Sequence, residues 1–268
     1  MVTKINKLIK NPVKFIPVVF RKIKQLATYF FQNKSFFLQG QMDIHPASGW
    51  HNVEFINETG GFLLLSDDVK REVVNLEPWD NTRRDMLILL LRTIAEKNIL
   101  GDIAEVGVYK GNTAKLFHYY MPEKKLHLFD TFQGFTERSV GMEKRKTQFN
   151  ISKEQFSDTS LDLVKKNIRP QNENISYYVG YFPDTVTKKC EESMFAFVHL
   201  DADLYDPIFE GLSFFYPRLN NGGMIVVHDY NAWVGARNAV NDFFMDKDEY
   251  VIPMPDKSGS AVIIKQFS

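Results

Sequence analysis

Apolar residues follow two recurring patterns between residues 81 and 264. Short, nearly continuous apolar runs are typical of buried strands, and we assign strands to residues 102–108, 126–130, 175–179, 194–200, 224–227, 250–252 and 261–264. Apolar positions at helical spacing lie between most of these runs. They predict helices over residues 81–98, 113–120, 159–167, 207–219 and 235–245.

Strands that alternate with helices predict an α/β fold with a doubly wound, mostly parallel, seven-stranded sheet. The last two strands have no helix between them, so they can form a hairpin with one antiparallel strand at or beside a sheet edge. Residues 131–156 are polar and contain two glycines, and they predict a loop. Ligands of such sheets bind beyond the carboxyl ends of the strands, where the functional residues are therefore expected.

The first candidate site is the turn after strand 102–108. Gly107 and Gly111 permit a tight turn into a helix, whose free N–H groups attract the polar part of a ligand. Asp130 ends the next strand, where a carboxylate suits the two hydroxyls of a ribose. A dinucleotide motif would need glycine in place of Tyr109 and Asn112, so a nicotinamide oxidoreductase is disfavoured.

A second turn follows the third strand. It contains Gly180, Tyr181 and Phe182, and its two aromatic side chains could flank a planar base. The same side chains are equally consistent with core packing.

A second candidate site combines the ends of the fourth and fifth strands. Asp201 follows one and Asp229 follows the other, with Asp203 and His228 close by in sequence. Crowded carboxylates must be neutralised by protonation, by a basic partner or by a divalent cation. Oxygen-rich sites suit Mg²⁺, Mn²⁺ or Ca²⁺. For Asp203, a role in bracing the loop is an equal alternative.

Composition and charge narrow the class of protein. The chain has 268 residues, a net charge of zero and one cysteine, Cys190, which excludes an internal disulfide and fits a reducing compartment. Residues 1–42 contain eight basic residues and no acid, which leaves 25 basic against 33 acidic residues in the remainder. An acidic main domain argues against nucleic acid as a partner.

Residues 1–42 predict a basic amphipathic helical extension, because apolar residues recur at helical spacing between Val18 and Phe31. The longest uncharged apolar run, residues 15–20, is too short for a signal peptide or a transmembrane span. The extension could lie on the anionic inner surface of a membrane, or it could pack on its own domain or a partner subunit. We favour packing and expect a homo-oligomer.

The remaining chain divides into residues 43–80, an irregular segment that we interpret as a lid or substrate loop, and residues 81–268, the main domain. Several motifs in the main domain resemble the macrocin O-methyltransferase family. They are AEVGV (104–108) with Gly111, YFPDT (181–185), DADLY (201–205), FYPRL (215–219), the glycine pair 222–223, HDY (228–230) and GARNAV (235–240). They occur in the family's order over about residues 80–247.

The resemblance implies a class I methyltransferase that uses S-adenosylmethionine and Mg²⁺ or Mn²⁺ to methylate a hydroxyl of a sugar or glycosylated small molecule. It assigns Glu105, Gly107 and Gly111 to the methionine part of the cofactor, Asp130 and Thr131 to the ribose, and Gly180, Tyr181 and Phe182 to the adenine. Asp201, His228 and Asp229 would bind the metal, and Asp201 would also accept the proton. The family usually has two aspartates before the tyrosine, and here His228 replaces the first.

Two alternatives share these residues. A methyltransferase for catechols or phenols would have the same site, and only its acceptor would differ. A cofactor-binding module without catalysis would dock on a partner or a membrane through its N-terminal helix. We expect a cytoplasmic enzyme, with a peripheral contact at the inner membrane surface if residues 1–42 bind lipid.

Overall fold

The structure is a computed structural model that describes residues 80–169 and 171–266. The predicted extension, residues 1–42, and the lid segment, residues 43–79, lie outside the described residues. Both therefore stay predictions, as does the choice between membrane and protein packing. Among the helices that the structure describes, none is long and apolar enough to cross a membrane.

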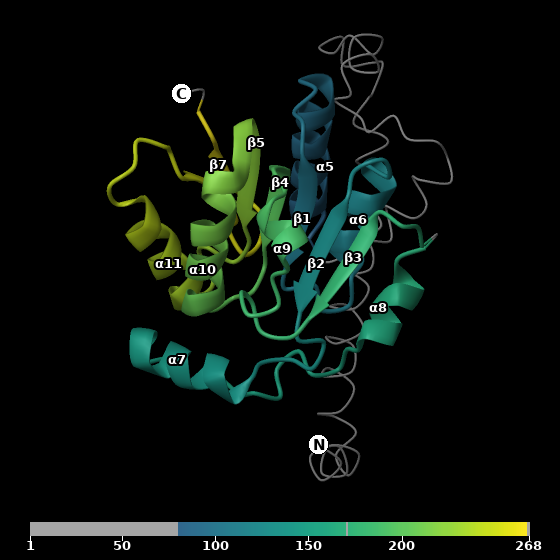
Figure 1. Cartoon of the computed structure of the whole chain (residues 1–268). Helices are drawn as coiled ribbons and strands as arrows, with labels where there is room; N and C mark the ends of the chain where they lie inside the picture. The colour runs from purple at the N-terminus through teal and green to yellow at the C-terminus, as the bar shows by residue number, and fades with distance from the viewer. Residues whose placement is uncertain (1–79, 170, 267–268) are drawn as a thin grey trace, which may run out of the picture. The chain divides into compact units, whose positions relative to one another are not determined.

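The main domain alternates strands and helices, as Figure 1 shows. The elements are α5 (Asn81–Glu96), β1 (Asp102–Val106), α6 (Asn112–Tyr120), β2 (Leu126–Asp130), α7 (Glu137–Thr147), α8 (Leu161–Asn167), β3 (Ile175–Val179), α9 (Lys188–Glu191), β4 (Phe195–Leu200), α10 (Tyr205–Phe215), the 3₁₀ helix η2 (Tyr216–Arg218), β5 (Leu219–Val227), α11 (Val234–Phe244), β6 (Ile252–Pro253) and β7 (Ala261–Ile264).

Within the described residues these strands form one seven-stranded sheet in the order β3-β2-β1-β4-β5-β7-β6. The first five of these strands run parallel to one another, whereas β7 runs antiparallel to both β5 and β6. The predicted fold class is confirmed, and so is the terminal hairpin. The parallel strands all end at the same edge of the sheet, and α7 lies beyond that edge (Figure 1).

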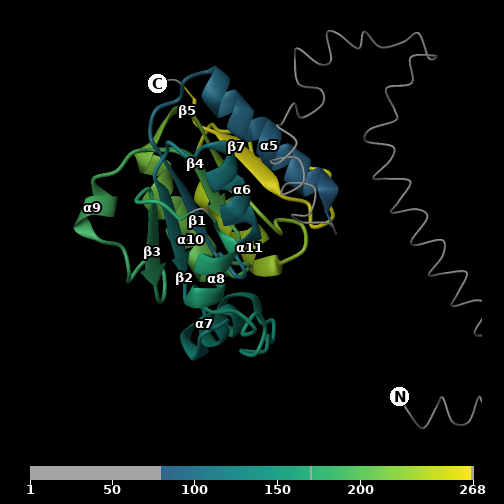
Figure 2. The same cartoon turned by 90° about the vertical axis from the view of Figure 1, so that its right-hand side faces the viewer.

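Helices cover both faces of the sheet, as the side view in Figure 2 shows. Helices α5 and α6 lie against one face, while α10 and α11 pack together against the other. Successive residues of a strand point to opposite faces, so β1 sends Ala104 and Val106 into the core beneath α10. Glu105 points the other way, toward α5 and α6, and this alternation places a carboxylate in an apolar layer.

Helix α7 is the main departure from the sequence prediction, which placed a loop over residues 131–156. Its eleven residues include few apolar side chains, so there is little helical periodicity to detect. Its end signals are strong instead. Thr136 and Ser139 form a capping box at the amino end, and Gln148 ends the helix in a left-handed conformation. The helix is therefore held by its ends and by two buried polar residues, Ser139 and Glu143.

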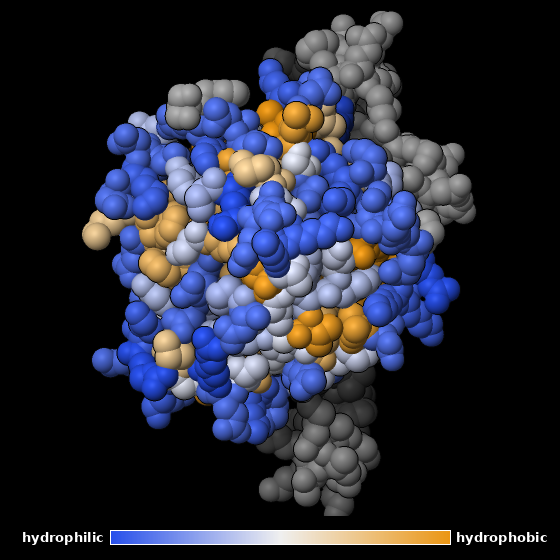
Figure 3. Space-filling model, in the orientation of Figure 1, coloured by the Kyte–Doolittle hydropathy of each residue, from blue (hydrophilic) through white to orange (hydrophobic). Residues whose placement is uncertain are grey.

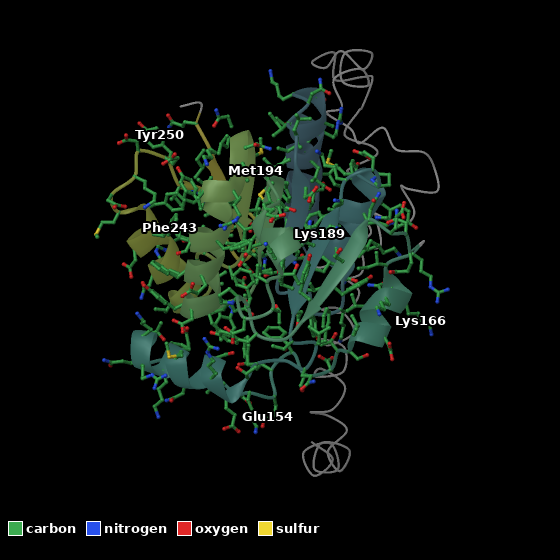
Figure 4. The ribbon with its side chains drawn as sticks, viewed as in Figure 1. Glu154, Lys166, Lys189, Met194, Phe243 and Tyr250 are labelled. Atoms are coloured by element: carbon green, nitrogen blue, oxygen red, sulfur yellow. The ribbon has the colours of Figure 1, made fainter. Side chains whose placement is uncertain are left out.

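Smaller differences concern element boundaries. Strand β5 begins at Leu219, five residues before the predicted start, and a short helix, α9, was not predicted. The surface seen in Figure 3 is mostly hydrophilic, and its hydrophobic residues form small separate patches. Charged side chains such as that of Lys166 on α8 point away from the sheet (Figure 4).

Candidate functional site

A cavity of about 430 Å³ lies at the carboxyl ends of β1, β2, β4 and β5. The turns after β1 and β2, the Gly180 turn, the loop after β4, and the end of β5 supply most of its lining. Of the predicted site residues, Gly107, Asp130, Thr131, Gly180, Tyr181, Phe182, Asp201, His228 and Asp229 line it. Glu105 and Gly111 do not line the cavity.

The glycine turn has a steric requirement at Gly107. Its φ is +86°, and a β-carbon there would lie 2.1 Å from the backbone oxygen of Asp201. Gly107 therefore lets the β1 turn approach the end of β4 closely. Gly111 has a φ of +80° and is the residue that precedes α6. Both glycines serve the turn, and only Gly107 reaches the cavity.

Asp130 ties the glycine turn to the end of β2. Its Oδ2 accepts hydrogen bonds from the backbone N–H groups of Val108 (2.7 Å) and Tyr109 (2.8 Å), and its Oδ1 accepts one from Phe132 (2.6 Å). Thr131 lies beside it and donates its hydroxyl to the Gly134 carbonyl at 2.7 Å. Asp130 thus holds the turn in shape through these hydrogen bonds, and it also lines the cavity.

Glu105 lies behind the cavity wall. Its side chain is fully buried, and its Oε1 accepts a hydrogen bond from the Thr113 hydroxyl at 2.5 Å. His199 on β4 places Nδ1 2.9 Å from the same oxygen. Burial raises the pKa of the Glu105 carboxyl well above its usual value, against the hydrogen bond from Thr113. Glu105 could therefore influence a ligand in the cavity only indirectly, through Thr113, which lines the cavity.

The Gly180 turn presents two aromatic side chains with different surroundings. Phe182 is buried and stacks on Phe215 of α10, with ring centroids 5.7 Å apart. Tyr181 is packed under the guanidinium of Arg138, which lies 4.0 Å from its ring centroid. Arg138 belongs to α7 and also pairs with Asp184 at 2.6 Å. Helix α7 therefore fixes one wall of the cavity.

Asp201, His228 and Asp229 meet at the ends of β4 and β5, as predicted from their positions in the sequence. The Nδ1 atom of His228 lies 2.7 Å from Oδ1 of Asp201 and 3.3 Å from Oδ2 of Asp229. Arg83 of α5 donates to the other oxygen of Asp201, Oδ2, at 2.5 Å. A basic partner, Arg83, thus helps to neutralise the crowded carboxylates.

Asp203 is the fourth member of this cluster. Both it and Asp229 have left-handed backbone conformations, with φ of 60° and 58°, which aspartate tolerates better than most residues. Asp203 is 6% exposed, lines the cavity and interacts with the side chain of Asp229. Asp203 can therefore contact a ligand in the cavity, in addition to any role in bracing the loop.

The ionisable groups of the cluster have pKa values that are shifted in different directions. Burial opposes ionisation of Asp201, but Arg83 and His228 together hold the pKa of its carboxyl well below the usual value. Burial also opposes protonation of His228, yet Asp201 and Asp229 raise its pKa to about 10. The pKa of Asp203 is raised well above its usual value, first by burial and then by Asp229.

The cluster fits a divalent cation. One ligand atom each from Asp201, His228 and Asp229 lies within 4.8 Å of the other two. The Nδ1 atom of His228 lies 2.7 Å from Asp201 and 3.3 Å from Asp229, and a cation bound here would replace the proton that these carboxylates stabilise on the imidazole. An imidazole nitrogen beside two carboxylates matches the donor set of Mn²⁺ or Mg²⁺ sites, with nitrogen favouring the former.

Two side chains beside the cluster, Arg83 and His199, are not predicted from the sequence. Arg83 lies on the first described helix, α5, and no sequence motif marks it. His199 is a polar residue inside the apolar run of β4, a signal that could have been detected. Burial lowers the pKa of His199 to about 3, so its imidazole is neutral.

The family model for macrocin-O-methyltransferase matches residues 80–259, which include every residue of the cavity described above. The chain belongs to the macrocin-O-methyltransferase family. The match ends within the β6–β7 hairpin and covers the sheet ends on which both candidate sites stand.

The curated relatives are O-methyltransferases by name, and one of the names includes a rhamnosyl group. Demethyldecarbamoylnovobiocin O-methyltransferase of Streptomyces niveus is 24% identical over 163 residues, which cover 54% of this chain and 59% of that protein. The 8-demethyl-8-(2,3-dimethoxy-alpha-L-rhamnosyl)-tetracenomycin-C 4'-O-methyltransferase of Streptomyces olivaceus is 24% identical over 172 residues, 60% of this chain and 64% of that protein. The chain thus spans about three fifths of the length of these relatives.

A solved structure shares the fold of this chain. The O-methyltransferase NovP superposes with a TM-score of 0.58 at 20% identity, over 69% of this chain and 80% of its own. At this identity the likeness concerns the fold alone.

Proposed function

We propose that this protein is an S-adenosylmethionine-dependent O-methyltransferase that methylates a hydroxyl of a sugar or glycosylated small molecule, with a divalent cation at the carboxylate cluster. The observation that supports this most is that one cavity is bounded by both the glycine turn and the cluster. A methyl donor held at the first would lie beside an acceptor held at the second. The names of the family's relatives support a glycosylated acceptor.

The cofactor would lie between the turns after β1, β2 and β3. Asp130 lines this part of the cavity, and a carboxylate oxygen has two lone pairs, so the backbone bonds of Asp130 leave capacity for a ribose hydroxyl. Thr131 would lie nearby. Tyr181 and Phe182, after Gly180, would flank the adenine. Gly107 and Thr113 would bound the methionine part, with Glu105 and Gly111 supporting them from outside the cavity.

The acceptor hydroxyl would meet the cluster of Asp201, His228 and Asp229. A bound divalent cation lowers the pKa of a hydroxyl that it contacts, which supplies the acidity that an alcohol lacks. The cavity walls contribute by aligning the acceptor oxygen with the methyl group. The protein's further task is to accept the proton.

Two carboxylates compete for that task. Asp201 was assigned it from the sequence, but Arg83 pairs with its Oδ2 and keeps its basicity low. Asp203 lines the same cavity and is not paired with Arg83, and burial and the neighbouring Asp229 raise its pKa, so it takes up a proton more readily than Asp201 does. We therefore assign the metal to Asp201 and the proton to Asp203.

The test of the proposal is turnover. The purified protein, labelled S-adenosylmethionine and Mg²⁺ are incubated with a panel of glycosides, nucleotide sugars and catechols, and the products are analysed by mass spectrometry. Methylation of a sugar hydroxyl supports the proposal. Methylation of catechols alone favours the phenolic alternative, and cofactor binding without any product favours the non-catalytic one.

Asp130→Ala should weaken S-adenosylmethionine binding by about 2–3 kcal/mol, the scale of hydrogen bonds to a charged group. Isothermal titration calorimetry measures the change. Asp158→Ala is a matched control, because Asp158 accepts bonds from the side chains of Tyr109 (2.6 Å) and Lys110 (2.5 Å) on the same turn but does not line the cavity. Equal affinity in a folded Asp130→Ala protein would remove the ribose assignment.

His228→Asp should shift the metal preference from Mn²⁺ toward Mg²⁺, because it replaces an imidazole nitrogen with a harder oxygen ligand. Activity titrations with each metal give the ratio of their half-saturating concentrations, and a fall in the Mg²⁺ value relative to that of Mn²⁺ is expected. The wild-type protein is the reference for this ratio. An unchanged ratio would argue that His228 is not a ligand.

A further inference from the structure

We propose that His199 is a positioning residue for the cation site, and this inference rests on the proposed function. His199 holds the guanidinium of Arg83 against Asp201. In that arrangement Asp201 keeps one carboxylate oxygen for Arg83 and turns the other toward His228 and Asp229. His199 thus lies on β4, two residues before Asp201 and outside the cavity lining, and positions that ligand through Arg83.

The first support is the strand register. Strands β1 and β4 are parallel neighbours in which Glu105 is paired with His199. Both side chains are fully buried on the sheet face that α5 and α6 cover. Thr113 reaches this pair from α6, and Arg83 reaches it from α5. Four elements therefore contribute to one buried polar chain.

The second support is the direction of the hydrogen bonds. The Nη2 atom of Arg83 lies 3.4 Å from Nε2 of His199, and an arginine can only donate. Nε2 must therefore be the acceptor, and the imidazole hydrogen must lie on Nδ1, which is 2.9 Å from Oε1 of Glu105. The two neighbours fix a single tautomer of His199, and that tautomer is the one that orients Arg83.

The third support is that one nitrogen of Arg83 makes both contacts. Nη2 lies 3.4 Å from His199 and donates to Oδ2 of Asp201 at 2.5 Å. With Oδ2 engaged, Oδ1 of Asp201 is the oxygen beside His228, at 2.7 Å. Groups that orient a metal ligand from behind typically change metal affinity by 10- to 100-fold when they are removed.

The test compares two substitutions of His199, each of which can replace only one of the two hydrogen-bonding nitrogens of the imidazole. The amide of His199→Asn can replace Nδ1 beside Glu105 but cannot reach Arg83, whereas that of His199→Gln can replace Nε2. We expect His199→Asn to weaken Mn²⁺ binding about tenfold or more. His199→Gln should stay closer to wild type. The affinities are measured by electron paramagnetic resonance of free Mn²⁺, which does not depend on turnover.

His127→Asn controls for the loss of a buried histidine. His127 is 3% exposed and lies within hydrogen-bond distance of Asp102 and Tyr178, at 2.9 Å each, outside the cavity lining. This variant should lose thermal stability without losing Mn²⁺ affinity. Equal weakening in His127→Asn and His199→Asn would overturn the positioning role. So would unchanged affinity in His199→Asn.

A measurement on the wild-type protein keeps the inference testable if the variants do not fold. Nitrogen-15 spectra of labelled histidine distinguish the two tautomers, and we expect His199 to carry its hydrogen on Nδ1. A hydrogen on Nε2 would overturn the inference. Wild-type protein that binds no Mn²⁺ would overturn the cation site itself, whereas wild-type binding with the other tautomer overturns only the role of His199.

Discussion

Chelation of divalent cations with EDTA should abolish methyl transfer and leave S-adenosylmethionine affinity nearly intact. An alcohol is too weak an acid to ionise near neutral pH, and a carboxylate base alone makes up little of the difference. The cofactor part of the cavity depends on other residues, chiefly Asp130 and the Gly180 turn, so cofactor binding should survive. Turnover and calorimetry on the same sample measure the two effects.

Addition of Mg²⁺ or Mn²⁺ to the chelated protein should restore the rate. The control is calorimetry before and after chelation, which shows that the protein is still folded. Full activity after exhaustive chelation, with no metal found by elemental analysis, would contradict the cation mechanism. The family and the fold would stand, because they depend on the sheet and on the match over residues 80–259.

Asp203→Asn should lower kcat by about two to four orders of magnitude, the range for loss of a positioned general base. The amide keeps the size of the side chain, and asparagine also tolerates the left-handed conformation that Asp203 adopts at φ 60°. The turn after β4 should therefore survive the change. Rates at saturating cofactor and metal measure the effect.

Asp206→Asn is the matched control, because this residue lies three positions further along the chain and does not line the cavity. Its kcat should be close to that of wild type. If Asp203→Asn retains a wild-type kcat while Asp201→Asn loses activity, the proton transfer returns to Asp201, as the sequence alone suggested. A loss in Asp203→Asn that comes with lost Mn²⁺ binding would instead make Asp203 a ligand.

The sheet could be predicted because its strands are buried and apolar on both faces, and the carboxylate cluster could be predicted because parallel strands end at one edge. Asp201 and Asp229 are brought together by topology alone. The partners of these residues could not be predicted. Arg83 approaches from α5 through side-chain packing, and neither its helix nor its spacing carries a signal for that approach.

Asp130 and Glu105 illustrate a second limit. Sequence position correctly placed each acid near the turn, but whether a side chain enters a cavity depends on which face of the strand it occupies. Glu105 occupies the face that α5 and α6 cover, and there it serves Thr113 and His199. Helix α7 was missed for a different reason, since its caps and its buried Glu143 stabilise it in place of an apolar stripe.

The contacts of helix α7 also suggest how the protein could be engineered. Ser139 of α7 lines the cavity, while Arg138 pairs with Asp184 and Glu143 accepts a hydrogen bond from the backbone N–H of Tyr205, and these two contacts hold the helix in place. The acids that would perform the chemistry stand on β4 and β5 instead. Exchange of residues on the inner surface of α7, with the Arg138 and Glu143 contacts kept, should therefore change which ligands the cavity accepts without removing the acids of the cluster.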